Sequence, residues 1–172
     1  MHITKILSFI VIMTLLLFSC IKDDESETIN YINVNSQIPT FAVEDTAGNT
    51  FSSKQFIGKQ SLLVFFGTYC PDCKQVLPVI EEVWKELKDD PRFLLVTISR
   101  KETAEVVSNY WKENQFTMPF YLDTRGEVFS LFANNTIPRI YIINPDNEVV
   151  WMAVESLDIS AKELIQKIKG LK

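Results

Sequence analysis

The sequence predicts one α/β domain over residues 37–172, a sandwich in which helices cover both faces of a central mixed sheet. Two continuous apolar segments, 61–68 and 92–99, suit strands that are buried on both faces. Each is followed by a segment with helical periodicity, and this alternation is typical of an α/β fold. The late segment 139–155 has the pattern of an antiparallel hairpin, which makes the predicted sheet mixed.

The first predicted elements are an extra N-terminal β-hairpin over residues 39–53, the strand 61–68 and a helix over 71–87. The buried positions expected from the spacing of this helix are Val76, Leu77, Ile80, Val83, Trp84 and Leu87. The carboxylates between Glu81 and Asp90 are interpreted as its solvated side.

A second helix is predicted after the strand 92–99, with Thr103 as its N-cap. Its inward-facing side chains are expected to be Val106, Val107, Tyr110 and Trp111. A short extended segment and a helical segment, 118–123 and 127–132, precede the hairpin. A closing helix is predicted from Ser160, because Ser160 and Glu163 have the spacing of a capping box. This helix is expected to bury Leu164, Ile165 and Ile168.

Residues 1–19 are predicted to be a lipoprotein signal peptide. The apolar run 6–18 follows a short positive start and is shorter than the roughly 20 residues that a membrane-spanning helix needs. It ends in Leu-Phe-Ser-Cys, which resembles a bacterial lipobox, so Cys20 is the expected lipidation site; the alternative is a secreted protein with a free Cys20.

Residues 20–36 are interpreted as the lipidated cysteine followed by a flexible acidic tether. Residues 21–25, Ile-Lys-Asp-Asp-Glu, resemble the lipoprotein export signal of Bacteroidota, although a merely hydrophilic spacer has the same composition. The resemblance implies a lipid-anchored protein of the cell envelope, on the outer membrane and facing the periplasm or the cell surface.

Charge and histidine content exclude several classes of function. The net charge is −5 and no basic patch is present, which argues against nucleic-acid binding. The only histidine, His2, lies in the predicted signal peptide. A mature chain without histidine has no Ser–His or Cys–His nucleophile and no HExxH zinc site.

Cys70 and Cys73 form a Cys-x-x-Cys pair, and three interpretations compete for it. A metal site needs about four ligands, and two thiolates without histidine are too few. A structural cross-link between residues so close in sequence stabilises little, because stabilisation grows with loop length. A redox pair is favoured, since Cys70 follows a buried strand at the start of a helix. Unpaired N–H groups and the helix dipole there favour the thiolate.

The redox interpretation gives the two sulfurs different roles. Pro71 suits the first helical turn, where its missing N–H removes nothing. Cys73, one turn into the helix, should be less exposed and able to attack a mixed disulfide that forms on Cys70. Cys70 is therefore the expected nucleophile and Cys73 the resolving thiol.

The strand, the Tyr69-Cys-Pro-Asp-Cys73 motif, the helical Pro78 and the later Ile137-Pro138 together resemble the thioredoxin superfamily. The N-terminal hairpin makes residues 37–172 most similar to its TlpA/ResA branch of envelope proteins. The resemblance implies a thioredoxin-like three-layer sandwich. It also implies a cis bond before Pro138, which would lie against the cysteines and offer backbone to a substrate. The substrate groove implied by the resemblance contains Tyr69, Pro71, Asp72, Ile137, Pro138 and Arg139.

Four positions depart from the family. Val64 and Val76 stand where relatives have buried acids, and Tyr69 replaces the usual tryptophan. Asp72 could partly replace those acids as a proton acceptor, or it is a surface carboxylate. Arg139 replaces a threonine, and it could approach Cys70 and stabilise the thiolate or simply point to solvent.

The expected function is thiol–disulfide exchange, without cofactor or metal, with thiols or disulfides of envelope proteins. A membrane thiol carrier would be the electron donor, and a monomer is expected. One alternative is a thiol-dependent peroxidase of the AhpC/TSA type, although Thr68 lies two rather than three residues before Cys70. The other is a non-catalytic surface lipoprotein that uses the fold as a binding scaffold.

Overall fold

The computed structural model describes residues 27–155 and 158–171. The predicted signal peptide and lipidation site Cys20 lie outside the described residues.

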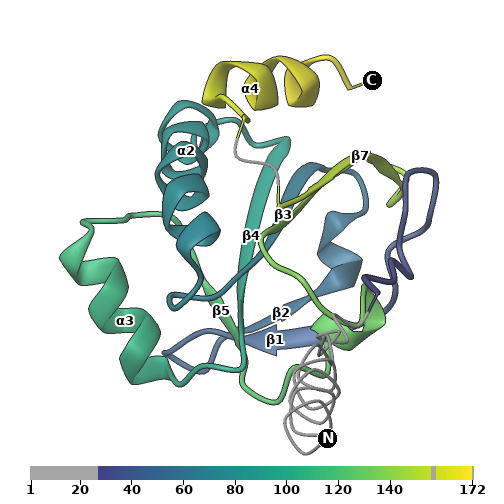
Figure 1. Cartoon of the computed structure of the whole chain (residues 1–172). Coiled ribbons are helices and arrows are strands. Elements are labelled where there is room, and N and C mark those ends of the chain that lie inside the picture. The colour runs from purple at the N-terminus through teal and green to yellow at the C-terminus, as the bar shows by residue number, and fades with distance from the viewer. Residues whose placement is uncertain (1–26, 156–157, 172) are drawn as a thin grey trace, which may run out of the picture.

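The core of the protein is a seven-stranded mixed sheet (Figure 1) with the order β2-β1-β5-β4-β3-β6-β7. Strand β3 is parallel to β4, and β4 is parallel to β5, whereas β6 and β7 run antiparallel to their neighbours. The predicted N-terminal hairpin, β1 and β2, extends the sheet at the β5 edge. The strands are β1 (Ala42–Glu44), β2 (Thr50–Ser52), β3 (Gln60–Phe66), β4 (Phe93–Arg100), β5 (Tyr121–Asp123), β6 (Arg139–Ile143) and β7 (Val149–Val154).

Three α-helices and two 3-10 helices complete the described fold. They are α2 (Pro71–Leu87), α3 (Ala104–Glu113), α4 (Ala161–Lys169), η1 (Ser53–Phe56) and η2 (Phe129–Leu131). The crossovers β3-α2-β4 and β4-α3-β5 step in the same direction along the sheet, so right-handed connections put both helices on one face. Helix α4 packs against α2 and β3, and Figure 1 shows α2 and α3 at the left of the sheet with α4 across the top, next to α2.

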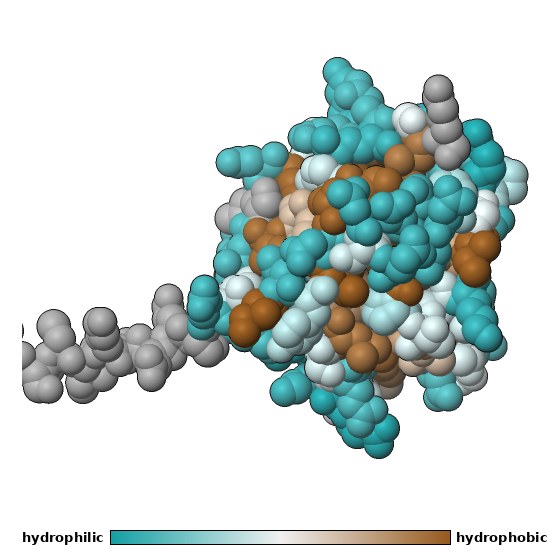
Figure 2. Space-filling model, turned by 90° about the vertical axis from the view of Figure 1, so that its right-hand side faces the viewer, coloured by the Kyte–Doolittle hydropathy of each residue, from teal (hydrophilic) through white to brown (hydrophobic). Residues whose placement is uncertain are grey.

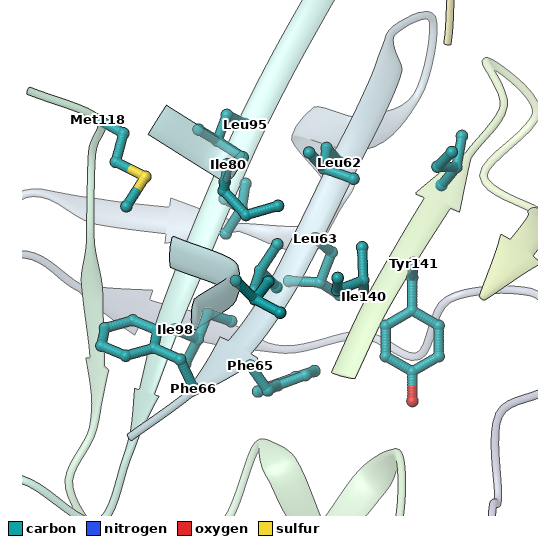
Figure 3. Close-up of a cluster of buried hydrophobic side chains, with 14 of the residues drawn as sticks. Leu62, Leu63, Phe65, Phe66, Ile80, Leu95, Ile98, Met118, Ile140 and Tyr141 are labelled. Atoms are coloured by element: carbon teal, nitrogen blue, oxygen red, sulfur yellow. The ribbon is translucent and has the colours of Figure 1, made fainter. Parts of the chain in front are cut away.

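Neighbouring side chains of β3 show that both faces of the sheet are covered. Phe66 packs on Trp111 of α3, with ring centroids 5.0 Å apart. Phe65 packs on Phe129 of η2 at 5.5 Å and on Phe132 at 4.8 Å. Figure 3 shows Phe66 and Phe65 diverging from the strand, Phe65 toward Tyr141. The α/β sandwich is therefore confirmed, with 3-10 helices rather than an α-helix on the second face.

The helix boundaries follow the local signals. Helix α2 spans Pro71–Leu87, as predicted. The hydroxyl of Thr103 accepts the Val106 N–H at the start of α3, and the hydroxyl of Ser160 accepts the Glu163 N–H at the start of α4. These are the predicted N-caps, and they satisfy backbone donors that have no partner within the helix.

The predicted burial of two side chains and the predicted helix over 127–132 are wrong. Val106 is 47% exposed, because Val107 and Trp111 already fill the inward side of the short helix α3. Ile165 is only half-buried beside the fully enclosed Leu164. The segment 127–132 forms only the short 3-10 helix η2.

Glu81 is not part of a solvated helix side, because it is 4% exposed. Its carboxylate accepts hydrogen bonds from the backbone N–H groups of Thr117 and Met118 and from the Thr117 hydroxyl, at 2.7–3.1 Å. Glu81 thus ties helix α2 to the loop that precedes β5, which explains why a charged side chain is buried there.

The part of the predicted tether that the structure describes is not a free spacer. Residues 27–36, the N-terminal strap, are hydrogen-bonded to the domain. Asn30 forms a β-bridge with Ala133, and the Tyr31 N–H donates to Phe132 O at 2.9 Å. The N–H of Asn35 donates to Val149 O at 2.8 Å, beside β7. The local sequence does not predict these contacts, because the partners of the strap lie about a hundred residues away in the sequence.

On the face shown in Figure 2, hydrophobic side chains form small separate groups among hydrophilic ones. Within the described ranges, none of the helices has the length and apolar character needed to cross a bilayer.

Candidate active site

Cys70 and Cys73 lie where β3 ends and α2 begins, and both are free thiols. Cys70 is the N-cap of α2, with its Sγ accepting the Cys73 N–H at 3.3 Å. Its own N–H donates to Gly67 O at 3.2 Å, and Pro71 occupies the first helical turn. Cys70 is 9% exposed and Cys73 is fully buried. Cys70 is thus less open than predicted, but it remains the more accessible sulfur.

The Ile137–Pro138 bond is cis, as predicted. Its loop lies against the first cysteine, because the Cys70 thiol donates to Ile137 O at a sulfur–oxygen distance of 3.4 Å. The structure therefore brings together two motifs that are 67 residues apart in the sequence.

Tyr69 and Ile137 flank the cysteines. Tyr69 is 58% exposed, and its ring folds back over Gly67. A Cβ atom added at Gly67 would lie 2.6 Å from the Tyr69 ring and 3.0 Å from Ile137 Cδ1. Glycine is therefore needed here for close approach, since any side chain would push against both neighbours.

The environment of Cys73 suits a protonated resolving thiol. Burial raises the pKa of the Cys73 thiol, and its hydrogen bond with Cys70 raises it further. The charge of the half-buried Asp72 acts in the same direction, whereas the backbone of Gly67 opposes it. Val64 and Val76 are buried apolar residues, so neither position offers a carboxylate to take the proton.

Arg139 does not point to solvent, because it is fully buried. Its guanidinium donates to Asn135 O at 2.9 Å, to Thr136 O at 2.9 Å and to Asn30 Oδ1 at 2.6 Å. The sequence alone left open whether this side chain approaches Cys70 or points to solvent, and arginine is rarely buried without such partners. Its hydrogen bonds go to the loop that leads into the cis bond.

Glu102 is a site residue that the sequence analysis missed. It is 8% exposed, and it binds the backbone and the hydroxyl of Thr68, two residues before Cys70. Ser99 Oγ also donates to it at 2.9 Å. The sequence signal that could have identified Glu102 is its position directly after a buried strand and before the N-cap Thr103. Among the described residues, no group of three or more His, Cys, Asp or Glu could hold a metal ion.

Comparison with known proteins agrees with this geometry. The redoxin family matches residues 33–165. The thiol-disulfide oxidoreductase ResA of Bacillus subtilis is 30% identical over 119 residues, which cover 69% of this chain and 66% of that protein.

Solved structures show the same fold. A solution structure from Bacteroides thetaiotaomicron, assigned provisionally as a protein disulfide isomerase, has a TM-score of 0.76 and 26% identity over 81% of this chain and 90% of that one. The crystal structure of StoA from Bacillus subtilis has a TM-score of 0.64 and 25% identity, covering 75% of this chain and 96% of that one.

The paired cysteines lie beside a cis-proline loop, and the relatives with this fold are thiol–disulfide oxidoreductases. Both findings identify the chain as TlpA/ResA-like, within the thioredoxin superfamily. Because the redoxin family model matches residues 33–165, the chain belongs to the redoxin family.

Proposed function

We propose that this chain, a thiol–disulfide oxidoreductase by its family and its paired cysteines, exchanges electrons with thiols or disulfides of envelope proteins. The observation that carries the proposal is the placement of Cys70 Sγ between the Cys73 N–H at 3.3 Å and Ile137 O at 3.4 Å. The Cys73 N–H donates to this sulfur. The cis-proline loop beside it offers backbone to a substrate. No cofactor is needed for this chemistry.

The reaction proceeds in two steps. The Cys70 thiolate attacks one sulfur of a substrate disulfide, whose S–S bond breaks and releases one substrate thiolate. Cys73 then gives up its proton and attacks the Cys70 sulfur. The second substrate thiolate leaves, and the Cys70–Cys73 disulfide remains. Two electrons have passed to the substrate, and the same steps run in reverse when the substrate is a dithiol.

Cys73 must pass its proton to an acceptor when it attacks, and the buried residues Val64 and Val76 offer no carboxylate for this. The first substrate thiolate to leave is a base that the reaction itself creates beside the buried thiol. A membrane thiol carrier would reduce the Cys70–Cys73 disulfide again and complete the cycle. Tyr69, Pro71, Asp72, Ile137 and Pro138 are the residues proposed to meet the substrate around Cys70.

Exchange activity is tested by insulin reduction with a thiol donor. The purified protein should accelerate the reaction, Cys70→Ser should abolish it, and Cys73→Ala should accumulate mixed disulfides with substrate proteins in cells. If wild type and Cys70→Ser are equally inactive and no adduct forms, the non-catalytic scaffold is favoured instead.

The peroxidase alternative is tested by peroxide consumption with the same thiol donor. We expect no peroxide consumption above the Cys70→Ser background, because the Thr68 hydroxyl already donates a hydrogen bond to Glu102 at 2.5 Å. Rapid peroxide consumption that depends on Cys70 would favour the peroxidase.

We further propose that a lipid on Cys20 anchors the domain, as a monomer, to the outer membrane, facing the periplasm or the cell surface. The lipobox-like residues 17–20 and the acidic residues after them support this location. Radiolabelled palmitate should be incorporated into wild type but not into Cys20→Ala, and protease treatment of intact cells would report the exposed side. An unlabelled wild type would overturn the anchor without affecting the exchange chemistry.

A further inference from the structure

Arg139 is a fully buried cation next to the cis bond, and a buried charge is tolerated only when its donors find partners. In the described part of the chain, none of the ion pairs includes Arg139. Its guanidinium instead meets neutral oxygens. Nε donates to Thr136 O at 2.9 Å and to Asn135 O at 3.2 Å, and Nη2 donates to Asn135 O at 2.9 Å. Nη1 donates to Asn30 Oδ1 at 2.6 Å.

The carbonyls that Arg139 binds belong to the two residues that precede Ile137. The next carbonyl along the chain, Ile137 O, accepts the Cys70 thiol. Thr136 has φ +74°, a left-handed conformation that is costly for a β-branched residue and persists only where its surroundings enforce it. Arg139 thus binds the carbonyl of this strained residue, one peptide before the carbonyl that faces Cys70.

The N-terminal strap binds the same loop. The Ile29 N–H donates to Asn134 Oδ1 at 2.8 Å, and Asn134 Nδ2 donates to Glu27 O at 2.8 Å. The hydroxyls of Thr28 and Thr136 lie 2.9 Å apart. Asn30 links the strap to the guanidinium. Loop 134–136, which is half-buried, is therefore held by hydrogen bonds from both the strap and Arg139.

We propose that Arg139 is a positioning residue for protein substrates, and that Asn30 of the strap acts with it. Together they fix loop 134–136 so that Ile137 presents its backbone beside Cys70 to an extended polypeptide that contains the disulfide. This inference rests on the proposed exchange function and adds the residues that position its protein substrates. A small disulfide needs only the Cys70 sulfur, so its reaction does not depend on the loop.

The test compares two disulfides on the same variants. Rate constants for attack by Cys70 are measured with glutathione disulfide and with an unfolded peptide that contains one disulfide. The variants are Arg139→Lys, which cannot donate to three acceptors in the same fork geometry, and Asn30→Ala, which removes only the strap acceptor. Arg92→Lys is the matched control, because Arg92 pairs with Asp90 at the surface.

For Arg139→Lys and Asn30→Ala we expect the peptide rate to fall at least tenfold and the glutathione rate to change less than threefold. Backbone amides of residues 134–137 should exchange hydrogen faster in both variants and not in Arg92→Lys. If Arg139→Lys fails to fold, Asn30→Ala decides by the same criteria. Unchanged peptide rates, or equal falls with both disulfides, would overturn the proposal. A wild type that reacts with neither disulfide would instead overturn the proposed function.

Discussion

The carboxylate of Glu102 accepts three hydrogen bonds from Thr68, two from its backbone N–H at 2.9 and 3.1 Å and one from its hydroxyl at 2.5 Å. Thr68 belongs to the loop that joins β3 to Cys70, and Glu102 follows β4. The carboxylate therefore holds the approach to the nucleophile against the neighbouring strand. Buried hydrogen bonds to an ionised acceptor are among the stronger ones in proteins.

Glu102→Gln is expected to lower the free energy of unfolding by about 1–3 kcal/mol, because the amide nitrogen cannot accept the donors that surround it. Chemical denaturation measures this change. Glu105→Gln is the control, since Glu105 is exposed in the first turn of α3 and should change stability far less. Equal effects of the two substitutions would contradict the anchoring role of Glu102.

Glu81 and Lys85 offer a matched pair on one helix. Glu81→Gln should destabilise the protein by about 1–3 kcal/mol, because it disturbs the buried hydrogen bonds to Thr117 and Met118. Lys85→Ala removes only a 3.4 Å ion pair from a largely exposed side chain and should cost less than about 1 kcal/mol. Thermal or urea unfolding gives both values. A larger effect at Lys85 would show that the ion pair, rather than the buried hydrogen bonds, dominates.

Alkylation of Cys73 should depend on pH as expected for a thiol of raised pKa. Burial, the largest cause of that shift, persists in Cys70→Ser. Because a raised pKa keeps the thiol protonated as pH rises, the iodoacetamide rate should stay low at neutral pH. It should still be increasing above the ordinary cysteine value of about 8.5.

The same Cys70→Ser protein unfolded in urea is the control for Cys73. There the thiol is solvated, and its alkylation rate should level off once pH exceeds the ordinary value. Identical profiles in the folded and unfolded states would contradict a raised pKa in the native protein.

Gly67→Ala should impair exchange with protein substrates more than it impairs folding. The added methyl group meets the exposed Tyr69 ring at 2.6 Å, and that ring can swing away. Ile137 Cδ1 at 3.0 Å must also shift. We expect the insulin reduction rate to fall severalfold while the melting temperature changes by only a few degrees. Gly48→Ala, in an open turn with φ +82°, provides a control that is strained but distant from the cysteines.

Local signals in the sequence determined most of the secondary structure. Pro71 and the apolar spacing after it defined α2, and Thr103 and Ser160 defined the starts of α3 and α4. These signals act between residues three or four positions apart, so they are readable in a short window. The Cys-x-x-Cys pair at a helix start indicated redox chemistry for the same reason, and resemblance added the cis bond at Pro138.

Only the tertiary structure decided where the polar side chains around the site lie. Glu102 meets Thr68 across 34 residues, Glu81 meets Thr117 across 36, and Arg139 meets Asn30 across 109. The local sequence does not indicate that any of the three charges is buried, because the cost of burying a charge is offset only by donors or acceptors from distant segments. Chain folding supplies those partners, and no pattern within a single helix or strand records them.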